Sequence, residues 1–408
     1  MQGDATGRLS GLDGLRGVAI LLVIMFHVVL EYPFRAGPDA LYYKLGGLGW
    51  IGVDLFFVLS GFLITGILLD NKGSGNYLLA FFGRRALRIF PLYYAVLIFL
   101  FVILPPFGVY DTPELQFVQS YQGFIWTFMT NWGFVAARDA HVFNVDWLAL
   151  VHFWSLAVEE QFYLVWPFLV LFLSRKRFIQ ACLLLLVGAL GFRLMIAVLE
   201  LPQGAAYTLT PARIDSLALG ALIAAAKRHS AYAERFLHIA APWCAAVAAI
   251  IMVIVFMTRN GIWFADRIMN TIGFSILAIG WGGVLVMSLP EHPRPLFRRI
   301  LSSPTVRLFG VYSYGLYILH HLILPQLPAR PFAELPLPEP VAATLYLLVC
   351  TAIFVAAAWL SWNLLEKRFL ALKWMFEYKP AKPVTGTRST SIAVPVGQEV
   401  PAKNQPAE

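Results

Sequence analysis

Ionisable side chains lie inside strongly apolar stretches of this sequence, and two of them share the first stretch. Arg16 and His27 are eleven positions apart. In an α-helix, eleven residues rise about 16.5 Å and complete about three turns, so both side chains face the same way at different depths. Ionisable groups inside a bilayer are costly and are functional candidates by default. The types suit a general base at position 27 and an anion ligand at position 16.

Further polar residues follow the same pattern when the apolar stretches are read as helices that cross a membrane in alternating directions. This reading predicts a belt of polar side chains in the outer half of the bundle, level with His27. The predicted belt contains Asp54, Trp154, Glu159, Arg213, Asp215, Tyr314, Tyr317 and His320. A separate basic cluster, Arg84, Arg85 and Arg88, is predicted at the inner surface. Two sites at two depths therefore need an explanation.

Each of these residues also has a plainer interpretation. His27 near a helix end is alternatively an interfacial residue, and Asp54 after Gly52-Val53 is alternatively a helix cap. The adjacent Glu159 and Glu160 cannot both face the core. The arginine cluster is alternatively a set of ordinary cytoplasmic cations.

Two further patterns do not favour a catalytic or metal-binding role. Ser60-Gly61 favours close helix packing over a nucleophile, because the sequence requires no base near it. His320-His321 does not predict a metal site, because adjacent side chains point apart on a helix.

The composition identifies the elements that must position these residues. The chain has 408 residues, of which 59% are hydrophobic and 13% are charged, with a mean hydropathy of +0.70. An average soluble domain is about 45–50% apolar and about 25% charged, so a disordered chain or a soluble enzyme is excluded. We expect an all-α polytopic membrane bundle of about ten transmembrane helices. The expected spans are 14–30, 48–69, 87–104, 148–173, 179–199, 213–226, 238–257, 268–288, 306–326 and 341–364.

The distribution of cations predicts the orientation of this bundle. Of the 31 Lys and Arg residues, 23 fall on the side of the two termini. The positive-inside rule therefore predicts that both termini are cytoplasmic. It also explains the net charge of +8 without nucleic acid as a partner. Residues 379–408 lack apolar periodicity, which predicts a disordered cytoplasmic tail.

Seven motifs in order make the chain resemble the membrane acyltransferase-3 family. They are Arg16 with His27, Gly52 to Phe62, Arg84 to Tyr93, Trp154 to Tyr163, Arg213-Ile214-Asp215, Ser313 to His320, and Glu366. Together they cover nearly the whole of residues 1–370, the expected acyltransferase domain. Arg368 stands where the family usually has proline. We expect no hydrolase-like domain after the spans, as in the stand-alone form of the family.

The resemblance implies a multi-pass enzyme of the bacterial cytoplasmic (inner) membrane. Such enzymes move an acyl group, often acetyl, from acyl-coenzyme A to a hydroxyl of an extracytoplasmic carbohydrate or lipid-linked glycan. No permanently bound cofactor and no metal are expected. Arg16, Arg84, Arg85 and Arg88 would then hold the phosphates of the donor.

The predicted belt would carry the reaction. His27 would act as the catalytic base, or as a covalent acyl carrier, with Asp54 orienting its imidazole and Glu159 completing the catalytic set. The acceptor would contact Trp154, Arg213, Asp215, Tyr317 and His320.

Two other functions remain open from the sequence. One is acylation of a small molecule or lipid in place of a glycan. The other, from a different class, is a proton-coupled secondary transporter, because such carriers also use buried Asp, Glu and His. Many carriers show an internal repeat, and none is apparent here.

Overall fold

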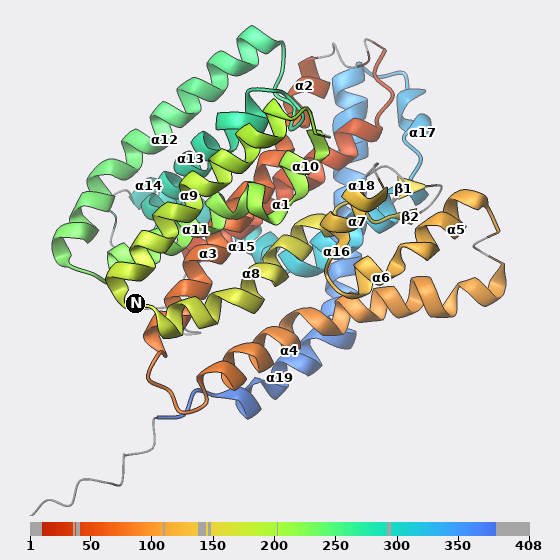
Figure 1. The fold of residues 1–408 in the computed structure, drawn as a ribbon. Coiled ribbons are helices and arrows are strands. Elements are labelled where there is room, and N and C mark those ends of the chain that lie inside the picture. The colour runs from red at the N-terminus through yellow and green to blue at the C-terminus, as the bar shows by residue number, and fades with distance from the viewer. Residues whose placement is uncertain are drawn as a thin grey trace, which may run out of the picture.

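The computed structural model describes residues 10–35, 37, 41–108, 111–137, 144–145, 148–201, 203–290, 292 and 295–380. The predicted disordered tail lies, from residue 381, outside the described residues. The described part is a bundle of helices (Figure 1). The longer helices are α1 (Ser10–Glu31), α3 (Gly52–Asp70), α4 (Tyr77–Ile98), α8 (Phe153–Phe172), α9 (Arg175–Val198), α11 (Thr210–Lys227), α12 (Ala231–Arg259), α13 (Phe274–Ser288) and α18 (Glu339–Ser361).

Shorter elements connect the long helices. They are α2 (Leu41–Gly47), α5 (Pro113–Ser120), α6 (Gln122–Trp126), α7 (Thr130–Ala137), α10 (Gln203–Thr208), α14 (Pro295–Leu301), α15 (Pro304–Val311), α16 (Ser313–Ile323), α17 (Arg330–Ala333) and α19 (Lys367–Ala371), with strands β1 (Asn144–Val145) and β2 (Leu148–Ala149). The strands pair antiparallel, with Val145 opposite Leu148. Three π-helical turns extend long helices at 99–103, 269–273 and 362–366.

Nine helical segments of the described chain are long and apolar enough to cross a membrane. The predicted polytopic helical membrane fold is therefore confirmed. The expected span 306–326 is wrong as a single helix, because α15 and α16 are separated by a break at Tyr312. Near the end of α15, a Cβ on Gly310 would lie 1.8 Å from the Asp13 carbonyl oxygen, so α15 lies directly against α1.

Hydrogen bonds between loops define the two ends of the bundle. Lys72 Nζ donates to the Leu173 carbonyl, and the Gly75 amide donates to the Lys379 carbonyl, so three loops meet at one end. We call this the basic end. At the opposite end, Lys44 Nζ donates to the Asn260 side chain. Both ends of the described chain lie toward the basic end (Figure 1). That this end faces the cytoplasm stays a prediction.

The centre of the bundle is held by close contact between α3 and α11. A Cβ on Gly61 would lie 1.9 Å from the Leu217 carbonyl oxygen, and one on Gly220 would lie 2.1 Å from the Val58 carbonyl oxygen. Only glycine permits such an approach of two backbones. The interpretation of Ser60-Gly61 as a packing motif is thus confirmed for its glycine.

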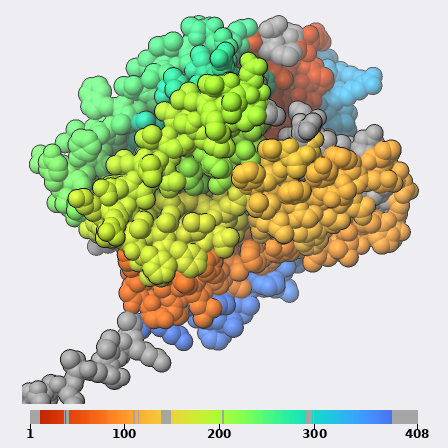
Figure 2. Space-filling model, in the orientation of Figure 1, coloured from red at the N-terminus to blue at the C-terminus, as the bar shows by residue number. Residues whose placement is uncertain are grey.

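Apolar side chains also cover the outside of the bundle. Figure 2 shows α8 and α9 at the centre of one face, with α12 on one side and residues 77–137 on the other. On α12 and α9, Trp243, Met257 and Leu184 are among the most exposed apolar residues, each at least 70% exposed. Such outward apolar surfaces suit contact with lipid.

Candidate active site

A pocket at the basic end gathers cationic side chains. It encloses about 1190 Å³ of space that is open to solvent. Its wall contains Arg16 from α1, the α4 arginines, Lys373 and Tyr378, with Asp13 as the one carboxylate among its lining residues. The guanidinium of Arg84 lies 5.9 Å from the Tyr378 ring centroid. The predicted meeting of Arg16 with Arg84, Arg85 and Arg88 is therefore confirmed, whereas their role toward a donor is untested. We call this space the entrance pocket.

The arginines reach the pocket because α4 begins earlier than expected. The sequence predicted a span from residue 87, but α4 begins at Tyr77 and carries Arg84, Arg85 and Arg88 on its third and fourth turns. These positions are i, i+1 and i+4, so Arg84 and Arg88 share one face and Arg85 lies beside it. The helix thus presents its cations to the bundle interior.

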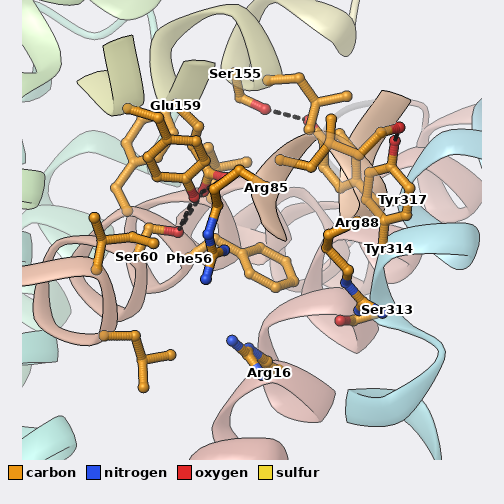
Figure 3. Close-up of a pocket in the computed structure, with 17 residues that line it drawn as sticks. Arg16, Phe56, Ser60, Arg85, Arg88, Ser155, Glu159, Ser313, Tyr314 and Tyr317 are labelled. Carbon is orange, nitrogen blue, oxygen red and sulfur yellow. Dashed lines mark hydrogen bonds between the residues drawn. The ribbon is translucent and has the colours of Figure 1, made fainter. Parts of the chain in front are cut away.

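A second pocket continues inward from the first. It spans about 770 Å³, which includes space open to solvent, and shares Arg16, Arg85 and Arg88 with the entrance pocket (Figure 3). We call it the inner pocket. Its remaining polar lining comes from α3, α8 and α16: Ser60, Ser155, Glu159, Tyr163, Ser313, Tyr314 and Tyr317. The shared arginines therefore lie between the two spaces, at the boundary of the entrance pocket and the inner pocket.

Glu159 organises one wall of the inner pocket. It accepts hydrogen bonds from Ser60 Oγ at 2.8 Å and from Tyr163 Oη at 2.9 Å. The Tyr163 hydroxyl is also 3.1 Å from Ser60 Oγ, and the Arg85 guanidinium lies 5.7 Å from the Tyr163 ring centroid. The sequence placed Glu159 level with His27, and the structure shows that α8 directs this carboxylate into the inner pocket that Arg85 also lines. The carboxylate beside Ser60 was also missed, because residues 99 positions apart show no pattern.

Two tyrosines of α16 form another wall of the inner pocket. Tyr314 Oη donates to the Ile89 carbonyl at 2.5 Å, and its ring lies 5.8 Å from the Arg88 guanidinium. Tyr314 therefore belongs with the arginines, not with the predicted outer belt. Tyr317 Oη donates to the His152 carbonyl at 2.7 Å and lies 2.5 Å from Ser155 Oγ. Its ring centroid is 5.9 Å from that of His320, so Tyr317 lies beside a group of histidines.

Four histidines cluster beyond Tyr317. His27 has ring centroids 5.0 Å from His320 and 4.2 Å from His321, and His152 lies 5.3 Å from His320. The predicted proximity of His27 and His320 is confirmed. His152 was missed, although it stands directly before the Phe153-Trp154 pair of a motif. Among the described residues, no group of three or more His, Cys, Asp or Glu is arranged to hold a metal ion.

Hydrogen bonds in this cluster select a tautomer for His27. His320 Nδ1 is 2.9 Å from the Leu316 and Tyr317 carbonyl oxygens, so this nitrogen carries the proton and Nε2 accepts. His27 Nδ1 is 3.1 Å from His320 Nε2 and 3.0 Å from the Val23 carbonyl oxygen, so it must donate. This assignment rests on the hydrogen-bond network. It leaves the lone pair of His27 on Nε2, the form that a general base needs.

Asp54 does not orient His27, which corrects the sequence prediction. Its Oδ1 accepts from Arg213 Nη2 at 2.6 Å and from Ser216 Oγ at 3.2 Å, and the Asp54 and Arg213 side chains are fully buried. Arg213 also lies 3.8 Å from the Phe274 ring centroid. Asp215 pairs with Arg193 at 2.9 Å instead of facing an acceptor. These groups hold α11 against α3, α9 and α13.

The predicted acceptor residues do not form one site either: some are buried in the core and others lie near His27. Trp154 is 5% exposed, and its ring centroid lies 4.6 Å from that of Tyr207. The Trp154 ring is therefore buried and is not open for stacking on a sugar ring. Trp154, Arg213 and Asp215 line neither pocket described above. The predicted outer belt was therefore wrong as one site: Tyr317 and His320 remain near His27, and the others pack in the core or line the inner pocket.

The described chain is a helical membrane bundle with basic internal pockets and a histidine cluster. Comparisons with known proteins identify its family. Residues 9–367 match the family described as "Acyltransferase domain". The chain belongs to this acyltransferase family, which confirms the resemblance seen in the motifs.

Curated relatives are similar over much of this chain. The O-acetyltransferase OatA of Staphylococcus aureus is 28% identical over 329 residues, which are 78% of this chain and 50% of that protein. The peptidoglycan O-acetyltransferase OatA of Listeria monocytogenes is 30% identical over 342 residues, or 78% and 49%. The putative peptidoglycan O-acetyltransferase YrhL of Bacillus subtilis is 30% identical over 339 residues. The chain thus matches about half the length of these relatives. No solved structure matches the chain significantly.

Proposed function

We propose that this protein is an O-acetyltransferase of the bacterial cytoplasmic membrane that acylates a hydroxyl of an extracytoplasmic cell-wall glycan. The acyl donor in this proposal is acetyl-coenzyme A. The observation that carries the proposal is that Arg16, Arg85 and Arg88 line both the entrance pocket and the adjoining inner pocket. The names of the relatives support an acetyl group and a glycan acceptor.

The charges of these two pockets suit the ends of the donor. Its phosphates would bind in the entrance pocket, because guanidinium groups bind phosphate with strong, partly bidentate hydrogen bonds. Its long arm would pass Arg88 into the inner pocket, where Glu159, Ser60 and Tyr163 offer polar contacts. The thioester would then reach Tyr317 and Ser155, which line this pocket and border the histidine cluster.

The transfer itself requires one base. The acceptor oxygen attacks the thioester carbonyl carbon while His27 Nε2 takes the hydroxyl proton. The carbon–sulfur bond then breaks, and the thiolate receives that proton from the imidazolium, so an ester and a free thiol are formed. A positioned base typically contributes about 10²–10⁴-fold to such a rate. Tyr317 and His320 separate His27 from the pocket in this structure, so the arm must pass these rings to reach it.

The experiment uses purified protein in liposomes with labelled acetyl-coenzyme A and a cell-wall glycan acceptor. We expect label in the glycan with the wild type and at least a hundredfold loss with His27→Ala. His229→Ala is the matched control, because His229 is exposed in the turn after α11 and lies outside the cluster. Full transfer by a folded His27→Ala protein would refute the role of His27. Wild-type protein that neither binds nor turns over the donor would refute the acyl-coenzyme A proposal.

A further inference from the structure

Residues 372–379, near the end of the described chain, lie against the start of α4. They follow α19, which Figure 1 shows beside α4, and they begin with a 3₁₀-helical turn at Leu372–Phe376. The family match ends at residue 367, so this stretch lies beyond the matched part of the chain. We call residues 372–379 the terminal segment.

Hydrogen bonds fix the terminal segment to the loop before α4. The Asn76 side chain makes two of them, because its Nδ2 donates to the Glu377 carbonyl at 2.8 Å and its Oδ1 accepts from the Lys379 backbone amide at 2.8 Å. The Gly75 amide donates to the Lys379 carbonyl at 3.0 Å. The backbone is therefore held on both sides of Tyr378.

Three side chains of the terminal segment are half-buried, whereas its other side chains are exposed. One of them, Phe376, packs over Gly83, where a Cβ would lie 2.1 Å from the phenylalanine ring. The other two, Lys373 and Tyr378, line the entrance pocket. The terminal segment thus forms part of the wall of a pocket whose other cations come from α1 and α4.

Tyr378 gives this wall an accessible aromatic ring. The second aromatic residue of the lining, Phe81, is 1% exposed, so it offers a ligand almost no surface. The Arg84 guanidinium lies 5.9 Å from the Tyr378 ring centroid, close to the outer limit of about 6 Å for a cation–π contact. Aromatic rings beside cationic side chains are the surfaces on which proteins stack nucleobases.

The structure of the donor explains why a base would lie at this wall. In coenzyme A, one ribose joins the adenine ring to the phosphates. A donor whose phosphates bind among Arg16, Arg84 and Arg88 must therefore place its adenine close to the entrance pocket. Within the lining of this pocket, Tyr378 is the aromatic surface available to stack on it.

We propose that Tyr378 stacks on the adenine ring of the acyl-coenzyme A donor, so that the terminal segment completes the donor site. This inference rests on the proposed function, because the donor is taken to be acyl-coenzyme A. Tyr378 is a binding residue, and Asn76 is a positioning residue that acts through the segment. Both lie at the basic end, so they contribute to donor affinity and not to the bond-making step.

The first test measures binding of the two halves of the donor to the full chain in lipid nanodiscs. Adenosine 3′,5′-bisphosphate and 4′-phosphopantetheine each compete with labelled coenzyme A. Stacking of one base on an aromatic side chain changes affinity on the order of tenfold or more. We expect Tyr378→Ala to weaken the adenosine half by about this factor and to leave phosphopantetheine unchanged. Equal affinity of Tyr378→Ala and the wild type for the adenosine half would overturn the inference.

Tyr378→Phe is the conservative variant. It keeps the ring, and the hydroxyl that it removes has no hydrogen-bond partner among the described residues. We therefore expect Tyr378→Phe to bind both halves as the wild type does. A loss of adenosine affinity in Tyr378→Phe as large as in Tyr378→Ala would show that the ring is not the binding surface.

The second test releases the terminal segment without changing its ring or its charges. Asn76→Ala removes both hydrogen bonds to the segment, so it should weaken the adenosine half and leave phosphopantetheine unchanged. Asn363→Ala is the control, since its amide donates to the Trp359 carbonyl and lines neither the entrance nor the inner pocket. A lowered melting temperature of Asn76→Ala with unchanged affinity for both halves would reduce the segment to a structural role and overturn the proposal.

Steady-state acetyl transfer keeps this inference separable from the proposed function. Tyr378→Ala should raise the donor KM about tenfold and leave kcat unchanged, because adenine lies far from the reacting carbonyl. Wild-type transfer from acetyl-coenzyme A without competition by the adenosine half would leave the enzyme in place and remove the adenine site. Wild-type protein that binds neither acetyl-coenzyme A nor phosphopantetheine would refute the proposed function, and the adenine site with it.

Discussion

The buried pair between Asp54 and Arg213 gives the sharpest test of the structure, because sequence reasoning assigned Asp54 to catalysis. The two side chains meet at 2.6 Å and are fully buried, and Ser216 adds a hydrogen bond at 3.2 Å. Asp54→Asn removes the negative charge and leaves the guanidinium uncompensated in the core. Breaking a buried pair from one side costs about 3–5 kcal/mol.

The structure provides a matched control for this substitution. Asp70 pairs with Arg228 at 2.7 Å, but its side chain is 56% exposed at the basic end. Exposed pairs contribute about 0–1 kcal/mol, so Asp70→Asn should change stability little. The double variant Asp54→Leu with Arg213→Met should recover most of the loss, because a buried ion pair is often replaceable by apolar side chains.

The assay is thermal unfolding in lipid nanodiscs, measured together with acetyl transfer. We expect Asp54→Asn to lower the melting temperature strongly and to lose activity in proportion to the folded protein lost. A variant with a wild-type melting temperature and lost transfer would refute the structural role. That result would return Asp54 to the catalytic function that the sequence suggested.

Three further predictions follow from the pockets and the helix packing. Arg85→Ala should raise the donor KM more than it lowers kcat, and Arg175→Ala, outside both pockets, should change neither; the opposite split in steady-state kinetics would reject phosphate binding. Ser60→Ala should lower kcat less than tenfold if the hydroxyl only positions its neighbours, whereas complete loss would identify a nucleophile. Gly61→Ala should prevent folding, because its Cβ would lie 1.9 Å from a carbonyl oxygen of α11; Gly188→Ala, with open space around it, should be neutral in a thermal melt.

Most of the fold was predictable because the membrane restricts the chain. Long apolar segments must form helices there, since each must satisfy its own backbone hydrogen bonds. The α15–α16 pair escaped this reasoning, as did the direct contact of Gly310 in α15 with the backbone of α1. No periodicity in the sequence reports such a contact between distant helices.

The site was less predictable, for a reason that Glu159 and Asp54 illustrate. Depth along a helix follows from residue number, and it brought His27 and His320 together correctly. The direction of a side chain around the helix axis depends on tilt and packing. Glu159 therefore lines the inner pocket together with Arg85, and Asp54 turned to Arg213. Partners for buried charges are chosen by three-dimensional packing, which one sequence does not specify.

The positive charge is concentrated at one end of the bundle, which determines where an anionic molecule is attracted. The entrance and inner pockets together contain Arg16, Arg84, Arg85, Arg88 and Lys373 against the carboxylates of Asp13 and Glu159. In a low-dielectric interior, uncompensated cations are stabilised most by a bound anion. In the histidine cluster, the hydrogen bonds make His320 a neutral acceptor at Nε2, so this residue offers an anionic donor much weaker attraction. Under the proposed function, an anionic donor would be held by its phosphates at the basic end, and only its uncharged acyl group would move on to His27.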